Sequence, residues 1–288
     1  MIWLFLAPSL VIFILYRIIP LGWNAVLSVE YWSPFKPTRF AGLAHYQEMF
    51  TYDDVFWQSL WNTVLFIASA PVAIAIALGL ALLVNSRISG REIYRTILFS
   101  SYPMMAVAVG IIWRWLYDEK VGLINFILLK VGVIDKAIPF LNSFQLALPA
   151  VIVAALWQIV GFFMIILLTG LQNIPRNLYE AAAIDGAGPL QQFRRITLPL
   201  LRPSIFLCMV IGIINSFTSF DLVYVMTSGG PSHATELLIT YIYRVAFSIS
   251  KFDYAAAMTM VLFLFLLVLT WASNRASGGE AGAVDTTQ

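Results

Sequence analysis

Long apolar windows alternate with short polar connections along most of the 288-residue chain. A helix needs about 20 mostly apolar residues to cross the hydrocarbon core of a bilayer, because each residue adds about 1.5 Å. Six windows have this length, and they lie at residues 2–29, 60–84, 97–117, 147–171, 200–220 and 255–274. The pattern therefore predicts an all-α integral membrane protein with about six transmembrane helices.

Composition supports this assignment. Hydrophobic residues make up 60% of the chain, charged residues only 11%, and the mean hydropathy is +0.85. A soluble domain carries about 25% charged residues, and this chain has too little polar sequence to cover six buried helices with a solvated surface. The net charge of +2 comes without any basic run, so nucleic acid is not expected as a partner.

The distribution of arginine predicts the orientation in the membrane. Short connections beside the apolar windows are rich in arginine, whereas the basic residues of the alternate connections are offset by carboxylates. The arginines are Arg87, Arg91, Arg95, Arg176, Arg194, Arg195, Arg202 and Arg275. Because basic residues close to span ends stay on the cytoplasmic side, both termini are expected in the cytoplasm. The aromatic connections of the other side are expected to form short surface helices near 43–50 and 235–247. We expect one membrane domain over 1–275 and a disordered tail over 276–288.

A polar module interrupts this pattern between the fourth and fifth windows, where residues 178–203 read LYEAAAIDGAGPLQQFRRITLPLLRP. The run NLYEAAAI favours a helix, Gly186 can adopt the left-handed conformation that ends it, and Pro189 can begin the next helix. Residues 175–199 are therefore expected to form a cytoplasmic helix–turn–helix. From the pattern alone, it is either a docking helix for another protein or an interfacial helix within an ordinary linker.

Polar side chains inside the apolar windows are the candidates for a solute site, because burying them in lipid is costly. Gln158 lies in the fourth window, close to Phe162, and Asn215, Ser216 and Ser219 lie in the fifth. Neutral amides and hydroxyls beside aromatic rings suit a sugar, which offers hydroxyls for hydrogen bonds and flat C–H faces for stacking. The alternative is that these groups only make hydrogen bonds between helices.

The remaining chemistry is sparse. The chain has no phosphate-binding loop of the form G-x-x-x-x-G-K-[ST] and no histidine at metal-ligand spacing. It also lacks the arrangement of acids, histidines or a nucleophile with a base that a membrane enzyme needs, so we expect no catalytic, cofactor or metal site. The single cysteine, Cys208, rules out an intrachain disulfide. An ion-coupled secondary transporter would need carboxylates within the membrane. Only Asp221, at the edge of a window, comes close, and this class is disfavoured.

The string EAAAIDGAGPLQQFRRITLPLLRP resembles the EAA signature of permease subunits from binding-protein-dependent ABC importers. The stretches FWQSLWNTVLF, LTGLQNIPRNLYEAAAIDGAGP and MTSGGPSHATELLITYIYRVAF are similar to the carbohydrate-uptake subfamily, and in particular to the first permease of its heterodimeric pairs. The resemblance covers residues from about 40 to 275. It implies the type I ABC importer permease fold in a bacterial or archaeal cell (inner) membrane.

The resemblance also implies partners and roles. The chain would be a non-catalytic subunit that forms half of a translocation pathway with a second permease in a heterodimer. Two ATPase subunits would bind ATP and Mg, and an extracytoplasmic solute-binding protein would deliver the solute. The membrane lipid would surround the complex. The residues that match the ATPase-coupling positions of the signature are Glu180, Ala181, Ala182, Asp185, Gly186 and Ala187.

The expected solute is a di- or oligosaccharide. By the resemblance, Gln158, Ser216 and Ser219 fall at or near positions that contact sugar in similar permeases, whereas Ala155, Ile159 and Gly212 depart from polar residues found in relatives. The pocket is therefore expected to be sparse in polar groups. Glycerol-3-phosphate or another polyol derivative is the alternative, because those permeases share the AAIDGAGP stretch. A phosphate would need a basic residue facing the pathway, and no lysine or arginine of the fourth and fifth windows is expected to do so.

Overall fold

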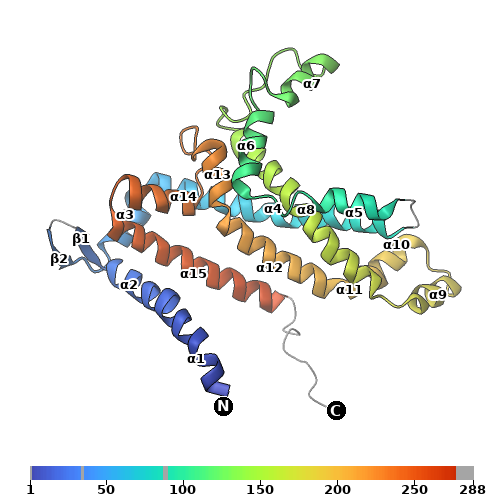
Figure 1. The fold of residues 1–288 in the computed structure, drawn as a ribbon, viewed down its shortest axis with the longest axis horizontal. Coiled ribbons are helices and arrows are strands. Elements are labelled where there is room, and N and C mark those ends of the chain that lie inside the picture. Colours follow the sequence, from blue (N-terminus) through green and yellow to red (C-terminus); the bar gives the residue numbers. More distant parts are fainter. Residues whose placement is uncertain (1, 34–35, 87–89, 277–288) are drawn as a thin grey trace.

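The computed structural model describes residues 2–33, 36–86 and 90–276, and it is an elongated bundle of helices (Figure 1). The first expected span is a helix formed by α1 (Ile2–Phe13), a π-helical turn η1 (Ile14–Ile18) and α2 (Ile19–Leu27). It ends two residues earlier than the window predicted.

A short antiparallel hairpin follows, with strands β1 (Glu30–Ser33) and β2 (Lys36–Phe40) that pair Glu30 with Phe40 and Tyr31 with Arg39. This hairpin is absent from the all-helical expectation. The next helix, α3 (Ala44–Tyr52), is the short surface helix expected near 43–50.

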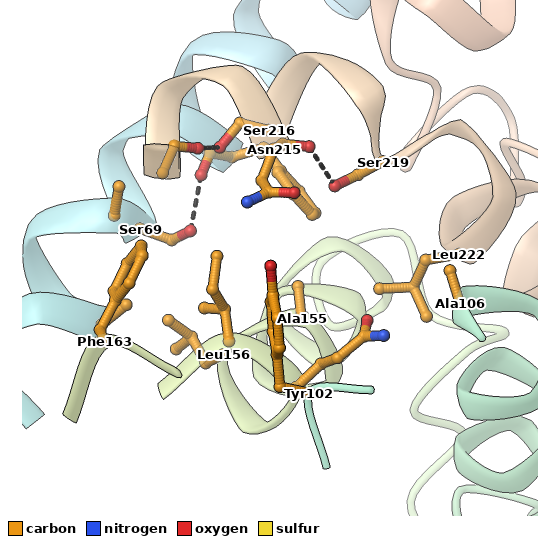
Figure 2. A pocket seen from close by; sticks show the side chains of 16 residues that line it. Ser69, Tyr102, Ala106, Ala155, Leu156, Phe163, Asn215, Ser216, Ser219 and Leu222 are labelled. Atoms are coloured by element: carbon orange, nitrogen blue, oxygen red, sulfur yellow. Dashed lines mark hydrogen bonds between the residues drawn. The ribbon is translucent and has the colours of Figure 1, made fainter. Parts of the chain in front are cut away.

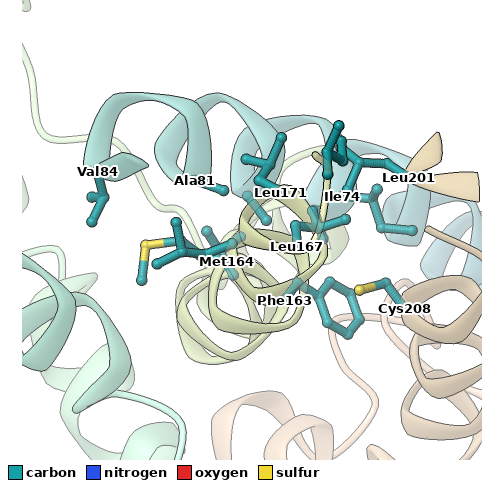
Figure 3. Close-up of a cluster of buried hydrophobic side chains, with 14 residues drawn as sticks. Ile74, Ala81, Val84, Phe163, Met164, Leu167, Leu171, Leu201 and Cys208 are labelled. Atoms are coloured by element: carbon teal, nitrogen blue, oxygen red, sulfur yellow. The ribbon is translucent and has the colours of Figure 1, made fainter. Parts of the chain in front are cut away.

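The centre of the bundle is the pair of long helices α4 (Asp54–Asn85) and α8 (Ala147–Gln172). On α4, Ala73, Ala77 and Ala81 recur every four residues and present a smooth surface to which α8 packs closely. The fully buried Phe163, Met164 and Leu167 of α8 fill this interface (Figure 3). Where small residues of one helix face large residues of the other, the two helices pack closely. Within a membrane, van der Waals contact rather than the hydrophobic effect then holds them together.

The expected third span, 97–117, is wrong as a continuous helix. The structure has α5 (Arg91–Phe99), a turn over residues 100–105, and α6 (Ala106–Leu116). Pro103 lies inside the turn, where its missing N–H and its ring disfavour an uninterrupted helix. The helix α7 (Leu123–Val131) then follows without having been predicted.

The polar module has the expected helix–turn–helix form. The helix α9 (Arg176–Ile184) ends at a turn in which Gly186 has φ +79°, and α10 (Pro189–Gln192) starts at Pro189. The second helix continues through the π-helical turn η2 (Phe193–Thr197) and α11 (Leu198–Leu200), one residue beyond the expected end at 199. It then meets α12 (Arg202–Thr218) at a bend of 62°.

The C-terminal third completes the bundle with α13 (Phe220–Thr227), α14 (Leu238–Tyr243), the π-helical turn η3 (Arg244–Ser248) and α15 (Phe252–Ala276). The last apolar window therefore starts within a longer helix. The surface helix expected near 235–247 corresponds to α14 and η3. The expected tail begins at Ala276, the last residue of α15, and its remaining residues, 277–288, lie outside the described part of the chain.

Among the described residues, three helices are long and apolar enough to cross a membrane: Leu6–Leu27, Asp54–Asn85 and Ala147–Gln172. The bent pair Pro189–Leu200 and Arg202–Phe217 counts as a fourth if it is one span, and Ala106–Leu116 and Phe252–Val268 are shorter apolar helices. The expected six spans therefore remain a prediction.

Candidate functional site

A cavity of about 380 Å³ lies between α4, α8 and α12, beside the turn that breaks the third apolar window (Figure 2). Ser219, at the break between α12 and α13, and Ala106, at the start of α6, lie at its margin. The lining residues are Phe66, Ser69, Ala70, Ala73, Tyr102, Ala106, Ala155, Leu156, Gln158, Ile159, Phe163, Gly212, Asn215, Ser216, Ser219 and Leu222.

Four of the five candidate solute residues meet in this cavity: Gln158, Asn215, Ser216 and Ser219. The Ser216 hydroxyl donates to the carbonyl oxygen of Gly212 at 2.8 Å, and the Ser219 hydroxyl donates to that of Asn215 at 2.6 Å. Both serine protons are thus used within α12, and each oxygen keeps lone pairs that can accept a hydrogen bond. The serines present acceptors to the cavity.

Gln158 also holds the broken third window in place. Its Nε2 donates to the carbonyl oxygen of Met104 at 2.9 Å, and the neighbouring Ser101 hydroxyl donates to the carbonyl oxygen of Trp157 at 3.0 Å. These two bonds fasten the turn over 100–105 to α8. Because the turn lacks a full set of helical hydrogen bonds, such side-chain bonds satisfy part of its backbone.

Phe162, the fifth candidate, does not line the cavity. Its ring stacks on Tyr102, with ring centroids 4.1 Å apart and an interplanar angle of 6°. Tyr102 does line the cavity, and Figure 2 shows its hydroxyl pointing into the cavity toward Asn215. Phe162 therefore positions Tyr102, which sequence reasoning missed. The available signal was Pro103, since a proline within an apolar window indicates a break that brings its neighbours to the helix end.

Apart from Ser69, whose hydroxyl donates to the carbonyl oxygen of Phe66, the remaining lining is apolar, and it includes Ala155, Ile159 and Gly212. The backbone of Gly212 approaches other parts of the wall closely, because a Cβ at this position would lie 2.9 Å from that of Ala70. No lining residue carries a charge at neutral pH. The cavity therefore offers hydroxyls, amides and the aromatic side chains of Phe66, Tyr102 and Phe163, a set suited to a neutral polar solute.

The six candidate coupling residues lie together on the helix–turn–helix. Glu180, Ala181, Asp185 and Gly186 are exposed, and Ala182 and Ala187 are half-buried. Large apolar side chains are exposed beside them, with Ile184 87% exposed and Leu190 63% exposed. Figure 1 places α9 at one end of the molecule, far from the hairpin and α3. This surface combines an exposed carboxylate with apolar groups.

Two side-chain bonds brace this module internally, and the packing of Tyr179 attaches it to the bundle. The hydroxyls of Tyr179 on α9 and Thr197 in η2 are 2.8 Å apart, and Thr197 is buried. Gln192 Nε2 donates to the carbonyl oxygen of Ala187 at 3.0 Å, which braces the turn. Tyr179 packs against the same core as Ile174 and Leu201, at the bases of α8 and α12. Movement of α9 is thereby linked to α8 and α12, two of the three helices that enclose the cavity.

A candidate metal site is not found among the described residues. They contain no group of three or more His, Cys, Asp or Glu side chains that could hold a metal ion. Cys208 is buried in the apolar core of α12.

Comparison with known proteins gives one consistent family. The model for the binding-protein-dependent transport system inner membrane component matches residues 1–276. The sulfoquinovosyl glycerol transport system permease protein SmoG of Agrobacterium fabrum is 35% identical, over 93% of this chain and 87% of that protein. The lactose transport system permease protein LacF of Rhizobium radiobacter is 34% identical, over 93% and 91%. The diacetylchitobiose uptake system permease protein NgcF of Streptomyces coelicolor is also 34% identical, over 96% and 83%.

The fold matches that of a solved structure. A chain from the crystal structure of a bacterial ABC transporter involved in the import of the acidic polysaccharide alginate superposes with a TM-score of 0.82. The match covers 97% of this chain and 96% of that chain at 24% sequence identity.

Proposed function

Because this chain belongs to the family of binding-protein-dependent transport system inner membrane components, we propose that it forms half of the translocation pathway of an ATP-driven importer for a di- or oligosaccharide. A second, different permease subunit supplies the other half. A solute-binding protein delivers the sugar from outside, and two separate ATPase subunits bind ATP and Mg and drive transport.

The observation that carries the sugar assignment is the uncharged cavity. Its polar groups are the serine oxygens of Ser69, Ser216 and Ser219, the amides of Gln158 and Asn215 and the hydroxyl of Tyr102. These groups can exchange hydrogen bonds with sugar hydroxyls, and the apolar wall accommodates C–H faces. The names of the related permeases agree, since they refer to sulfoquinovosyl glycerol, lactose and diacetylchitobiose.

The alternative solute, glycerol-3-phosphate or another polyol phosphate, fits the cavity less well. A phosphate group is bound by Arg or Lys side chains, backbone N–H groups or helix N-termini. The cavity lining contains no Arg or Lys, and its hydroxyl protons at Ser216 and Ser219 are already donated within α12. A neutral solute is therefore favoured.

In this proposal the chain itself hydrolyses no ATP. An ATPase subunit binds the exposed surface of α9 and the turn that follows it, and this contact couples the conformational change of the ATPase to the permease. Glu180 supplies an exposed charge, and Ala181, Ala182 and Ala187 leave the backbone accessible to a close-fitting groove. Gly186 has a left-handed backbone that a residue with a side chain adopts only with strain. Asp185 lies directly before it.

The test is the ATPase activity of the complete complex in proteoliposomes, stimulated by solute-binding protein loaded with one compound at a time. The panel contains lactose, diacetylchitobiose, longer oligosaccharides and glycerol-3-phosphate. Stimulation by a sugar alone supports the proposal. Stimulation by glycerol-3-phosphate alone transfers the assignment to the alternative, and stimulation by none of the panel contradicts the sugar assignment.

The coupling role is tested in the same complex with Glu180→Gln and Gly186→Val. Both variants are expected to reduce uptake per ATP hydrolysed at least tenfold, because they change the charge and the turn of the docking surface. Glu119→Gln is the matched control, since Glu119 is also exposed but lies on the connection between α6 and α7. Wild-type uptake by both coupling variants would exclude this surface as the ATPase contact.

A further inference from the structure

A row of six aromatic side chains begins beside the cavity and ends at the hairpin. The row consists of Phe220, Tyr224, Tyr243, Phe247, Phe252 and Trp32, and neighbouring ring centroids are 4.9–5.8 Å apart. Phe220 directly follows Ser219, which lies at the cavity margin, and its ring stacks on that of Tyr224 at an interplanar angle of 16°. Interacting aromatic pairs have centroids about 4.5–7 Å apart, so the row is continuous from the cavity to β1.

The middle of this row is exposed. Tyr224 is 45% exposed, Tyr243 38% and Phe247 65%. Asp221 is exposed three residues before Tyr224, so both side chains lie on the same face of α13. No basic side chain of the described residues pairs with this carboxylate. We call these four residues the outer aromatic surface: Asp221, Tyr224, Tyr243 and Phe247.

Two contacts of Arg244 hold together the two helical segments that carry this surface. Its guanidinium donates to the carbonyl oxygen of Ser228, directly after α13, at 2.8 Å. It also pairs with Glu236 at 2.7 Å, and the Glu236 side chain is only 1% exposed. Because Arg244 directly follows Tyr243 and begins η3, which contains Phe247, these contacts fix both rings against α13. The surface is therefore ordered before any ligand binds, as a binding site requires.

The outer aromatic surface has the chemistry of a carbohydrate-binding site. Aromatic rings offer flat apolar faces for the C–H faces of a pyranose. The carboxylate of Asp221 can accept hydrogen bonds from two neighbouring sugar hydroxyls, and such bonds to a charged group are strong. The hydrocarbon of the membrane does not match this surface, because a carboxylate that faces lipid tails is costly.

The size and the position of the cavity indicate which sugar units would reach this surface. The cavity volume of about 380 Å³ lies near the lower end of the range for small-molecule sites, which is about 300–1,000 Å³. A longer oligosaccharide must therefore extend past the cavity margin. Ser219 forms this margin beside α13, so the next sugar units would meet Phe220 and then the outer aromatic surface. Figure 1 shows α13 and α14 toward the hairpin end, away from α9.

We propose that the outer aromatic surface binds the units of an oligosaccharide that extend beyond the cavity. This proposal rests on the proposed function, which supplies an oligosaccharide as the solute. The cavity binds the first units through its amides and hydroxyls, and the surface binds the following units through its rings and the Asp221 carboxylate. The surface therefore contributes to the transport of long sugars and not to that of a disaccharide.

The experiment compares a disaccharide with the tetrasaccharide of the same linkage in the reconstituted complex. Diacetylchitobiose, cellobiose and maltose are each paired with their tetrasaccharide, and kcat/KM of ATP hydrolysis is measured against loaded binding protein. Phe247→Leu keeps an apolar side chain but removes the ring, so kcat/KM for the tetrasaccharide should fall about 5- to 10-fold. Asp221→Asn should lower it about tenfold, because a hydrogen bond to a charged group is lost. The disaccharide should keep its wild-type value in both variants.

Two further variants separate ring stacking from general packing. Phe247→Tyr retains a ring and should restore most of the tetrasaccharide response that Phe247→Leu loses. Phe144→Leu removes a ring that is 59% exposed on the connection before α8, and both sugars should keep their wild-type values. Copurification of the second permease subunit measures assembly and should equal the wild-type level in every variant.

Four results would overturn the proposal. Equal losses for the disaccharide and the tetrasaccharide would assign the surface to the binding protein, and loss of the second permease would assign it to the subunit interface. Wild-type values for both Phe247→Leu and Asp221→Asn would assign the rings to the membrane interface. A wild-type complex that responds to a disaccharide but to no tetrasaccharide would leave the surface without a ligand. None of these results contradicts the proposed function, which is contradicted when no sugar stimulates the complex.

Discussion

At the scale of single residues, the polar side chains of the cavity differ in how many of their hydrogen-bond donors are already used within the protein. The hydroxyls of Ser216 and Ser219 donate hydrogen bonds to carbonyl oxygens of α12, and one N–H of Gln158 donates a hydrogen bond to the carbonyl oxygen of Met104. The hydroxyl of Tyr102 points into the open space (Figure 2). Tyr102 is therefore the side chain whose contribution to solute affinity can be measured with the smallest change to the wall.

Tyr102→Phe removes that hydroxyl and preserves the stacked ring. We expect the apparent KM for sugar-loaded binding protein to rise about 2- to 10-fold, because one hydrogen bond contributes about 0.5–1.5 kcal/mol. The measurement is stimulated ATPase activity of the reconstituted complex. Tyr52→Phe, on the exposed end of α3, is the control and should leave KM unchanged. An unchanged KM in Tyr102→Phe would show that the solute does not bind this hydroxyl.

Sequence reasoning found most of the polar wall because amides and hydroxyls are rare in apolar windows. It assigned Phe162 to the solute, whereas this ring supports Tyr102 from behind. Tyr102 faces the cavity because the chain turns between α5 and α6. A continuous helix over residues 97–117, as the sequence predicted, would not place the Tyr102 ring in this way. Ser69 was missed because a serine at one isolated position resembles ordinary packing.

At the scale of elements, close backbone contacts hold the broken third window against α8. A Cβ on Gly161 would overlap the carbonyl oxygen of Leu98, so α5 approaches α8 at a position where only glycine fits. Ser101 and Gln158 add hydrogen bonds on the next turn of α8 toward its N-terminus. The contact places Tyr102 at the cavity. No periodic pattern in the sequence could indicate this approach, because it depends on a glycine in another helix.

Gly161→Ala tests this contact. The added methyl group must push α5 away from α8, and we expect a loss of about 1–3 kcal/mol in stability, as overpacking typically causes. The matched control is Gly79→Ala in α4, where a Cβ meets no other atom within 4 Å. There, alanine should be neutral or stabilise by up to about 1 kcal/mol. Thermal unfolding of the purified permease measures both, and equal transition temperatures would contradict the close approach.

The hydrogen bond between the hydroxyls of Tyr179 and Thr197 predicts that these residues help to couple movement of α9 to the rest of the permease. Tyr179→Phe or Thr197→Val removes a link between α9 and η2, the turn that leads through α11 into α12, so we expect less sugar transported per ATP hydrolysed. We expect the amount of sugar transported per ATP to fall about 2- to 10-fold, because one hydrogen bond contributes about 0.5–1.5 kcal/mol. The double variant should be no worse than either single one, because both remove the same interaction.

Copurification of the ATPase subunits distinguishes a loss of coupling from a loss of ATPase binding. Copurification of the ATPase subunits should stay at the wild-type level in all three variants, because Tyr179 and Thr197 lie behind the exposed face of α9. A fall in ATPase recovery that matches the fall in transport would assign the two residues to docking. Additive losses in the double variant would mean that the two hydroxyls act separately.

At the scale of the whole molecule, one carboxylate joins three helices at the hairpin end. Asp53 caps α4 by accepting the N–H of Phe56 at 2.9 Å, and it accepts the hydroxyls of Tyr241 at 2.8 Å and Tyr254 at 2.7 Å. Burial, followed by the hydrogen bond to Asp53, raises the pKa of Tyr241 above its usual value. The tyrosine therefore remains a hydrogen-bond donor throughout the physiological pH range.

Asp53→Ala should therefore destabilise the fold by about 2–4 kcal/mol, from the loss of one helix cap and of two hydrogen bonds to a charged group. Asp54→Ala is the matched control, because Asp54 is the adjacent carboxylate and is exposed. Its effect should stay within about 0.5 kcal/mol. Equal denaturant midpoints for the two variants would show that Asp53 does not join the helices at this end.

The two ends of the molecule also differ in charge, and this asymmetry predicts its orientation. Arg176, Arg194, Arg195 and Arg202 lie in or beside the coupling module. At the hairpin end, Arg244 and Lys251 pair with Glu236 and Glu48, and Asp53 and Asp253 lie there too. Because basic residues close to span ends are retained in the cytoplasm, α9 should face the cytoplasm and η3 the outside. The helical ends of the chain, α1 and the C-terminal end of α15, should then share the side of α9.

Cysteine labelling in whole cells tests this orientation directly, because the native Cys208 is fully buried and should not react. Ser248→Cys places an exposed thiol in η3, and Ile184→Cys places one at the end of α9, where the native side chain is 87% exposed. A membrane-impermeant maleimide should label Ser248→Cys in intact cells and Ile184→Cys only after permeabilisation. The wild-type chain controls for Cys208. The reverse pattern would put the proposed ATPase-coupling surface outside the cell, where no ATPase subunit could drive it.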